Sequence, residues 1–263
     1  MPCFNYGRYL GEAVASLLAQ EPDPPRVVVV DDGSTEPETH RALDALPPEV
    51  KVLRMANGGV ATARNAGMAR ADTPFVLMLD ADDRLARGAL ERLRGALAGH
   101  PRAGFAYGDQ RFFGSWSGEM RMPPYDPLRL LDRHLIGPTA LMRAELIHAT
   151  GGYDPDFALY EDWELWLSAL AHGWHGVHVD AVTHEYRQHG RSKLATDRRR
   201  YRAFRRQAMA KHRQLYRGRS RLEASSDLGA LGRLVYRWFW GPRPLPAVAE
   251  SWAARTLLSR SSG

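Results

Sequence analysis

The chain has 263 residues, which is enough for one large domain or two small ones with a substantial buried core. Hydrophobic residues make up 44% and charged residues 25%, ordinary globular values that exclude a disordered or fibrous protein. The single cysteine, Cys3, excludes an internal disulfide framework and a cysteine-based zinc site. No run reaches the roughly 18 apolar residues that span a bilayer. We therefore expect a reducing, cytoplasmic setting.

The net charge of +6 is divided unevenly along the chain. Residues 1–183 carry 17 basic against 25 acidic side chains, a net −8, whereas residues 184–263 carry 19 against 5, a net +14. This division predicts different roles for an acidic body and a basic tail. We expect the body to hold a cation or a polar small molecule. The tail either faces something anionic or forms a solvated helical face.

The first hundred residues alternate between two hydrophobic periods. From Tyr9 to Leu18 apolar residues recur at helical spacing, which predicts an amphipathic helix. Residues 26–30 form a short β-branched run, typical of a strand buried on both faces. The same patterns recur as strands over residues 50–55 and 75–79 and helices over residues 60–71 and 86–98. This alternation indicates βαβ units, in which ligands bind beyond the carboxyl ends of the strands.

The pattern is less regular after residue 100. A hairpin across Gly108 and Asp109 is expected from two short strand-like runs. Further strands are expected over residues 140–143, 174–179 and 183–187, and a buried helix over residues 163–170. Beyond residue 194 the chain is expected to be helical and Arg-rich up to residue 221, followed by a linker and an aromatic segment over residues 231–240.

Acidic residues follow the predicted third strand. Two carboxylates two positions apart, as in Asp80-Ala-Asp-Asp83, can converge on one hard cation. Oxygen ligands favour Mg²⁺ or Mn²⁺, and Mg²⁺ is usually shared with substrate phosphates. The alternative is a surface turn in which Asp82 or Asp83 caps the next helix.

A second acidic pair follows the predicted first strand. One carboxylate of Asp31-Asp32-Gly33 can accept a hydrogen bond from a base or a sugar hydroxyl, and the glycine lets the backbone approach a ligand closely. The alternative is a simple strand-to-helix connection in which Ser34 or Thr35 is the N-cap.

Two further clusters lie in the second half of the chain. Glu161 and Asp162 stand at the start of a predicted buried helix, at the edge of an apolar environment that suits a general base. Alternatively, the two acids only stabilise the helix dipole. Downstream, His189 can complete a metal shell and Arg187 or Arg191 can pair with phosphate, or these can be solvated loop residues.

These clusters, in this order, resemble the inverting glycosyltransferases of family 2, which have the GT-A fold and use nucleotide sugars. The resemblance extends over about residues 2–193 and rests on seven segments: PCFNYGRYL (2–10), VDDGST (30–35), GVATARNAG (59–67), LDADD (79–83), GGYD (151–154), YEDW (160–163) and YRQH (186–189). It implies an α/β, Rossmann-like fold with a mixed, mostly parallel sheet flanked by helices. It divides the chain into a GT-A domain (residues 1–193) and an Arg-rich helical extension (residues 194–263).

The resemblance also implies a role for each matching residue. The nucleotide-sugar site would comprise Pro2, Phe4, Asp31, Asp32, Arg64, Asn65, Asp80 and Ala81, with Phe4 against the nucleobase and Asp80 near the ribose. Asp82 and His189 would hold the metal that bridges the diphosphate, and Asp162 would be the catalytic base. Glu161, Trp163 and Arg187 would belong to the acceptor site or the closing loop.

The implied reaction needs one base and one metal. Mg²⁺ or Mn²⁺ would stabilise the charge that develops on the leaving diphosphate, and a carboxylate would take the proton of the attacking acceptor hydroxyl. The Gln-x-x-Arg-Trp signature of processive synthases is absent from the sequence, which favours single additions. We expect a nucleotide-sugar donor and a sugar or lipid-linked glycan acceptor, in cell-surface polysaccharide or glycolipid assembly. The sequence does not reveal the donor sugar or the acceptor.

Several alternatives stay open at this point. The family pattern has a β-branched strand just before Pro2, so either the start site is misassigned or the sheet lacks that strand. The tail either rests on an anionic membrane surface as a peripheral contact or packs back on the catalytic domain. Acceptor contacts are expected over residues 114–135, where Trp116 and Tyr125 can stack on a sugar ring. The competing hypothesis is that the protein is catalytically impaired and that its basic tail binds nucleic acid or an anionic membrane.

Overall fold

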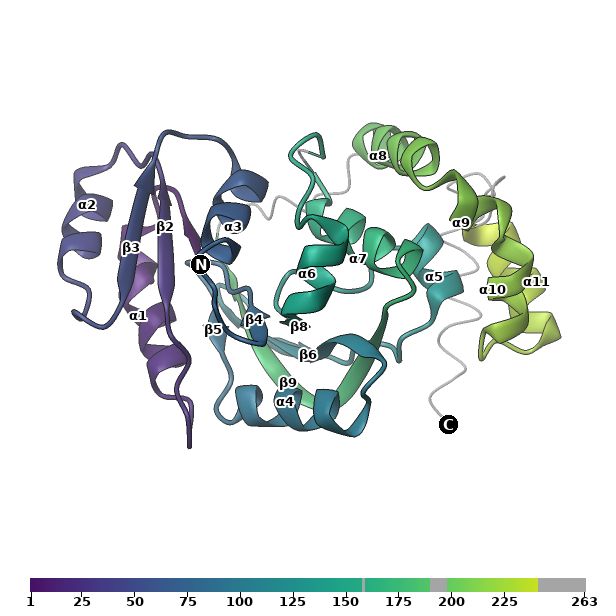
Figure 1. The fold of residues 1–263 in the computed structure, drawn as a ribbon, viewed down its shortest axis with the longest axis horizontal. Coiled ribbons are helices and arrows are strands. Elements are labelled where there is room, and N and C mark those ends of the chain that lie inside the picture. The colour runs from purple at the N-terminus through teal and green to yellow at the C-terminus, as the bar shows by residue number, and fades with distance from the viewer. Residues whose placement is uncertain (158, 190–197, 241–263) are drawn as a thin grey trace.

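The computed structural model of the chain describes residues 1–157, 159–189 and 198–240 (Figure 1). Its first half contains β1 (Pro2–Cys3), α1 (Gly7–Leu18), β2 (Val28–Asp32), α2 (Pro37–Asp44), β3 (Lys51–Met55), α3 (Val60–Met68), β4 (Phe75–Leu77), β5 (Arg84–Leu85), α4 (Ala89–Gly99) and β6 (Ala103–Gly114). There follow β7 (Gly118–Met120), α5 (Pro127–Asp132), β8 (Leu141–Arg143), α6 (Ala144–Thr150), α7 (Glu161–Ala171) and β9 (His175–Gln188). The tail forms α8 (Arg198–Lys211), α9 (Arg213–Arg217), α10 (Arg219–Ser225) and α11 (Ala230–Trp240).

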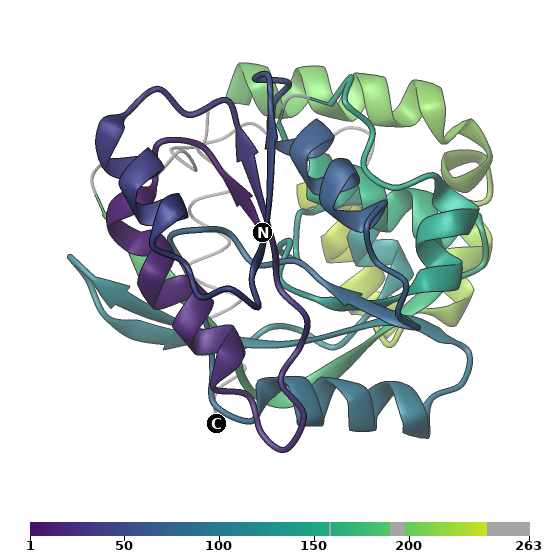
Figure 2. The ribbon, with the colours of Figure 1, turned by 60° about the vertical axis from the view of Figure 1, so that its left-hand side comes forward.

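The first sheet is parallel, with the strand order β1-β2-β3. Helices α1 and α2 lie on one side of it and α3 lies on the other (Figures 1 and 2). Val29 and Val30 of β2 are therefore fully buried, as the β-branched run predicts. Backbone pairing reaches the first residue of the chain, because the Met1 amino group donates to the Val28 carbonyl at 2.9 Å.

The second sheet has the order β4-β8-β6-β9-β5, with β7 paired to β6. The β6–β9 pair is parallel and the other pairs are antiparallel. Helix α4 covers one face of this sheet, and α6 and α7 cover the other (Figure 1). The mixed α/β architecture is thus confirmed.

The predicted hairpin across Gly108 and Asp109 is wrong. β6 continues through both residues as one strand, and its hairpin partner is β7. Gly108 serves a different purpose, because a Cβ there would lie 2.5 Å from Thr183 on the paired strand β9. The glycine lets two strands approach, at a point where their register shifts. β9 is likewise one strand where two short ones were expected.

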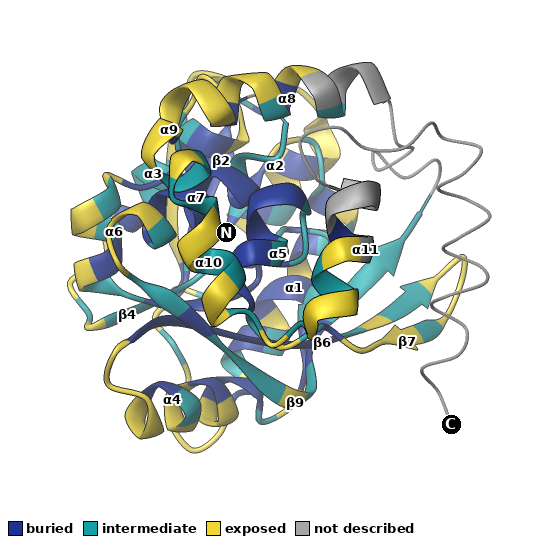
Figure 3. Ribbon diagram, turned by 90° about the vertical axis from the view of Figure 1, so that its right-hand side faces the viewer, coloured by how far each residue is buried: buried dark blue, intermediate teal, exposed yellow. Residues whose placement is uncertain are grey.

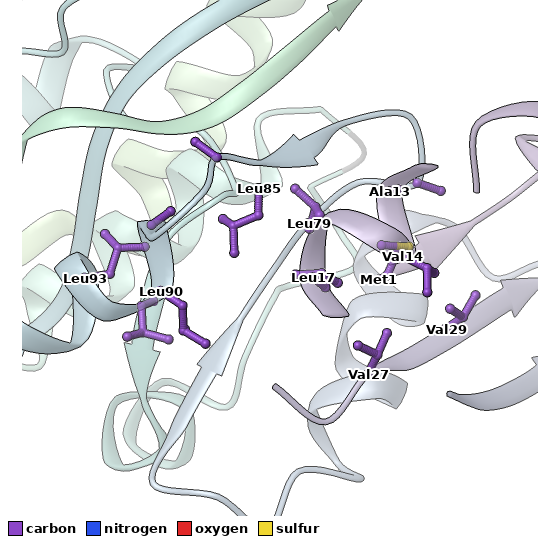
Figure 4. Packing of buried hydrophobic residues seen from close by; sticks show 14 of the residues in the cluster. Met1, Ala13, Val14, Leu17, Val27, Val29, Leu79, Leu85, Leu90 and Leu93 are labelled. Atoms are coloured by element: carbon purple, nitrogen blue, oxygen red, sulfur yellow. The ribbon is translucent and has the colours of Figure 1, made fainter. Parts of the chain in front are cut away.

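Two apolar clusters form the core. One joins α1 and β2 to the segment from β5 to α4, with Val14 and Leu17 on the first side and Leu85 and Leu93 on the second (Figure 4). The other surrounds α7, whose Trp163 and Trp166 are completely buried. Figure 3 shows this buried region beneath the tail helices.

The tail helices pack against the second cluster. The Phe204 ring of α8 stacks on Trp163 with ring centroids 4.5 Å apart, and the Tyr236 hydroxyl of α11 donates to the Arg129 carbonyl at 3.0 Å. Both aromatic residues are buried, at 4% and 5% exposure. Of the two predictions for the tail, packing on the body is therefore confirmed for these aromatics. Residues 241–263, to which the membrane prediction also applied, lie outside the described residues.

Acidic groups of the body neutralise part of the tail's charge. Asp132 at the end of α5 is fully buried and pairs with Arg205 at 2.9 Å and Arg219 at 2.7 Å. Glu164 of α7, also fully buried, pairs with Lys211 and His212 at 2.8 and 2.9 Å. The opposite charges of body and tail thus meet inside the molecule. In the described ranges, no helix combines the length and the hydrophobicity needed to span a membrane.

Candidate active site

A cleft of about 690 Å³ opens at the ends of β1 and β2, beside the acidic turn that follows β4. Ten of the predicted site residues line it: Pro2, Phe4, Asp32, Arg64, Asp80, Ala81, Asp82, Glu161, Arg187 and His189. Asp31, Asn65, Asp162 and Trp163 lie outside its lining. Segments that are far apart in the sequence therefore meet at the strand ends, the place where open α/β sheets bind ligands.

Asp32 shapes one end of the cleft through the backbone. Its carboxylate accepts hydrogen bonds from the amides of Gly58 at 2.7 Å and Gly59 at 2.9 Å, which fixes the turn into α3. Asp31 is also buried, and its carboxylate accepts from Ser34 N at 2.9 Å within its own loop. Only Asp32 of this pair therefore faces the cleft.

The expected N-cap role of Ser34 or Thr35 is wrong. Helix α2 begins later, with Glu36 at the N-cap position and no side-chain capping bond. The two hydroxyls instead hold Asn5: Ser34 Oγ accepts from its backbone amide at 3.1 Å, and Thr35 Oγ1 accepts from its side-chain amide at 3.2 Å. This cross-link holds the loop that exposes Phe4, which is 43% exposed beside the cleft.

Backbone strain borders the cleft. Among the described residues, the non-glycine residues with positive φ are Asn5 at 58° and Tyr160 at 60°. Asn5 follows Phe4, and Tyr160 precedes Glu161, so each adjoins a cleft residue. Such conformations cost about 1–3 kcal/mol each and concentrate at functional sites.

Arg64 joins three of the motif segments. Its buried guanidinium, 3% exposed, donates to Asp80 at 2.8 Å and to Glu161 at 2.7 Å. Burial alone would lower the pKa of Arg64, but the two carboxylates raise it, so the side chain stays charged. The neighbouring Asn65 is turned away from the cleft and makes a reciprocal pair of bonds with the Tyr153 backbone at 2.7 and 2.9 Å.

The acidic turn after β4 meets the end of β9. Asp82 Oδ2 lies 2.8 Å from His189 Nε2, and the Asp82 carbonyl accepts from Arg187 Nε at 2.7 Å. Asp83 binds His184 at 2.7 Å and Arg187 N at 2.8 Å. The alternative in which Asp82 or Asp83 caps the next helix is wrong, because the N-cap of α4 is Gly88. These carboxylates hold β9 in place instead.

The donor set at this turn suits a hard divalent cation. Asp82 supplies a carboxylate and His189 supplies an imidazole. Burial and the neighbouring Asp83 raise the pKa of Asp82, which means that they disfavour its ionised form, and a bound cation would stabilise that form. Within the part of the chain that the structure describes, no three His, Cys, Asp or Glu side chains form a ligand cluster. Two protein ligands are compatible with Mg²⁺ or Mn²⁺, which commonly complete their coordination with substrate phosphates and water.

Glu161 and Asp162 occupy different environments at the start of α7. Glu161 lines the cleft, and burial together with Asp162 raises its pKa. Asp162 is 6% exposed, and its Oδ2 lies 2.8 Å from His134 Nε2. Burial would raise the pKa of Asp162, but His134, together with Arg64 and the Trp163 amide, outweighs burial and lowers this pKa. The two carboxylates thus have divergent proton affinities.

Sequence reasoning missed His134 and misplaced one aromatic residue, Trp163. His134 is 28 positions from Asp162 in a connection that carries no motif, so only the fold reveals the contact. Trp163 is completely buried and donates to the Leu130 carbonyl at 2.6 Å, which places it in the core and not at an acceptor site. Tyr125 meets Phe105 edge-on with ring centroids 5.8 Å apart and does not line the cleft, and its stacking on a sugar ring stays a prediction.

The fold is that of solved glycosyltransferase structures. Staphylococcus aureus TarS residues 1–349 with UDP-GlcNAc give a TM-score of 0.63 at 19% identity, covering 90% of this chain and 71% of that one. The mannosyltransferase PcManGT of Pyrobaculum calidifontis, with GDP-Man and Mn²⁺, gives 0.56 at 21% identity, covering 99% and 79%. The GT-A fold is therefore established by architecture.

Residues 1–162, more than half of the chain, match the model of the family described as glycosyl transferase family 2. The protein therefore belongs to this family. Succinoglycan biosynthesis protein ExoU of Rhizobium meliloti is 41% identical over 92 residues, 34% of this chain and 27% of its own. The Escherichia coli UDP-Gal:alpha-D-GlcNAc-diphosphoundecaprenol beta-1,3-galactosyltransferase is 24% identical over 191 residues, 66% of each chain. An uncharacterized glycosyltransferase of Nostoc sp. is 41% identical over 83 residues, 30% of this chain and 26% of its own length. The chain thus matches only about a quarter of two of these relatives.

Proposed function

We propose that the protein is an inverting glycosyltransferase that moves one sugar from a nucleotide-diphosphate sugar to an acceptor hydroxyl. The observation that carries this proposal is the single cleft in which Asp32, Asp82 and Glu161 meet, although they are far apart in the sequence. Relatives and structural neighbours whose names or bound ligands include UDP-Gal, UDP-GlcNAc and GDP-Man support the donor class.

The donor end of the cleft is formed by β1, β2 and the acidic turn. The exposed Phe4 ring offers a flat apolar surface for the nucleobase, and Asp32 lies at the same end. Asp80, held by Arg64, is positioned for a ribose hydroxyl. Pro2 and Ala81 also line the cleft. Asn65 contributes indirectly by fixing the helix that carries Arg64.

Asp82 and His189 would hold Mg²⁺ or Mn²⁺, with a bound Mn²⁺ in a structural neighbour as support. When bound, the cation stabilises negative charge on the departing diphosphate. Arg187 adds a fixed positive charge beside this turn, because its guanidinium is held by Asp82 and Glu12. The positive charge of Arg187 would thereby help to orient the diphosphate end of the donor.

Asp162 is the proposed general base. It takes the proton of the acceptor hydroxyl while the new C–O bond forms at the anomeric carbon and the bond to the diphosphate breaks from the opposite face. Its lowered pKa keeps it ionised, and although it lies outside the cleft lining, it directly follows Glu161, which lines the cleft. Apo geometry often leaves such groups short of contact until the acceptor binds.

An aromatic row leads from the cleft to the proposed acceptor surface. Tyr186 lines the cleft and contacts Phe112 with ring centroids 5.8 Å apart, and Trp116 follows at 4.9 Å. Trp116 is 57% exposed, and Ser115 N donates to the cleft residue Gln188 at 2.9 Å, which anchors the hairpin there. We assign Trp116 to stacking on an acceptor sugar ring.

A role in cell-envelope glycan assembly at the inner face of the membrane fits the relatives, one of which is named for a diphosphoundecaprenol-linked acceptor. Leu231 and Leu234 of α11 are 74% and 49% exposed and offer an apolar contact for a lipid surface. Liposome flotation of the full chain tests this part. Equal recovery of wild type and a Leu231→Glu/Leu234→Glu variant with anionic vesicles would show that α11 makes no membrane contact.

The central experiment compares two carboxylates and a control. After a thermal-shift screen of nucleotide sugars with Mn²⁺, transfer is measured with Asp162→Asn, Glu161→Gln and Asp180→Asn, the last an exposed aspartate of β9. Asp162→Asn should lower turnover about 10²–10⁴-fold with donor affinity preserved, and Asp180→Asn should match wild type. Full turnover in Asp162→Asn, with loss in Glu161→Gln, would assign the base to Glu161. No donor binding by wild type would favour the impaired alternative.

A further inference from the structure

The imidazole of His134 is held beside the proposed base by three contacts. Its Nε2 lies 2.8 Å from Asp162 Oδ2, and the two side chains are 23% and 8% exposed. The ring stacks on Trp163 at a centroid distance of 6.0 Å and meets Tyr160 edge-on at 5.5 Å. Because Trp163 is fixed in the core, the imidazole has a defined orientation toward the carboxylate.

The charges around Asp162 leave His134 as its direct partner. Glu161 precedes it on α7, and Arg64 of α3 faces the pair but is bonded to Asp80 and Glu161. The Tyr153 hydroxyl, from the connection between α6 and α7, also faces these acids. The remaining oxygen of Asp162, Oδ1, accepts the backbone amide of Trp163 at 2.8 Å.

Two adjacent buried carboxylates would ordinarily compete for one proton. Here Arg64 binds Glu161 and His134 binds Asp162, so each acid has its own basic partner. Burial raises the pKa of Glu161, whereas at Asp162 the effect of burial is overcome by the imidazole, with smaller contributions from Arg64 and the Trp163 amide. When the environment moves the pKa values of two neighbouring carboxyl groups apart, the group with the lower pKa is the one that stays ionised and can accept a proton during the reaction.

We propose that His134 is a positioning residue for the transfer reaction: its Nε2–H donates to Asp162 Oδ2, fixes the carboxylate and selects Asp162 over Glu161 as the ionised base. This inference rests on the proposed function. In this proposal His134 itself does not take the acceptor proton, because its Nε2 is engaged with Asp162. Its contribution is the geometry and charge of its partner.

The first experiment measures kcat against pH for His134→Gln, His134→Ala and His148→Gln, the last an exposed histidine of α6 that serves as control. Loss of the partner should lower kcat about 10²-fold in His134→Ala and move the acidic limb of the profile to higher pH, with the donor KM unchanged. His134→Gln, which keeps a neutral N–H donor, should fall in between. An unmoved acidic limb in both variants would overturn the proposal.

The second experiment needs no turnover. The imidazole ¹⁵N and ¹H resonances of the full chain are titrated in wild type and Asp162→Asn, with the His134 signals identified by their loss in His134→Gln. His134 should titrate at higher pH in wild type than in Asp162→Asn, because the carboxylate stabilises the imidazolium. Identical titration would refute the pairing. If the pairing holds but wild type transfers no sugar, the proposed function fails and not the His134–Asp162 contact.

Discussion

Removing the Phe204 ring tests whether the tail helices belong to the catalytic unit. The side chain is 4% exposed and packs on the rings of Trp163, Tyr160 and Phe157 at centroid distances of 4.5, 5.3 and 5.6 Å. Trp163 cannot move into the space that Phe204→Ala would leave, because its indole N–H is bonded to the Leu130 carbonyl. The cavity should therefore persist, and the expected loss is about 3–5 kcal/mol in the free energy of unfolding.

For a chain of this size, such a loss corresponds to a fall in Tm of about 6–20 °C. Thermal unfolding and urea titration measure the effect, with Met209→Ala as the matched control on the same helix. Met209 is 37% exposed, so its truncation should change stability by no more than about 0.5 kcal/mol. If Phe204→Ala were no less stable than Met209→Ala, α8 would not pack on α7. The boundary proposed at residues 193 and 194 would then separate two independent units.

Three further predictions address the cleft and its supports. Asp82→Ala should abolish the Mn²⁺-dependent part of donor binding seen by calorimetry, while leaving the metal-independent part unchanged. Trp116→Ala should raise the acceptor KM about 2–10-fold with the donor KM constant, and an unchanged acceptor KM would remove Trp116 from that surface. His134→Ala should be less stable than wild type chiefly between about pH 4 and pH 6.5, as followed by unfolding across pH. The difference should fade as the pH falls through the lowered pKa of Asp162 and as it rises through the raised pKa of His134, so a constant difference would contradict an ion pair.

The early elements of the fold could be predicted from local pattern. The helix expected from Tyr9 to Leu18 is α1, and the β-branched run ending at Val30 is β2, within two residues at each end. In these segments the hydrophobic period and the buried face agree, so local sequence is a sufficient guide. The hairpin prediction at Gly108 failed because glycine is needed there for the close approach of the neighbouring strand β9, which the local sequence does not indicate.

The acidic motifs could likewise be identified from the sequence, whereas the different contacts of their individual aspartates could not. Asp31 and Asp32 are chemically identical neighbours, yet one closes its own loop and the other faces the cleft. Alternation along a strand separates their directions, but which face holds the ligand depends on what packs against the sheet. Asp83 belongs to the same acidic run, but it binds β9 about a hundred positions later.

Motif order and charge balance were enough to indicate the family, the acidic cleft and a basic tail, because these properties reside in residue types and short spacings. The partners of buried charges required the folded chain. His134 reaches Asp162, and Arg205 and Arg219 reach Asp132, across long sequence separations. A buried ionic group must find an opposite charge wherever packing brings one, and packing is a property of the whole molecule.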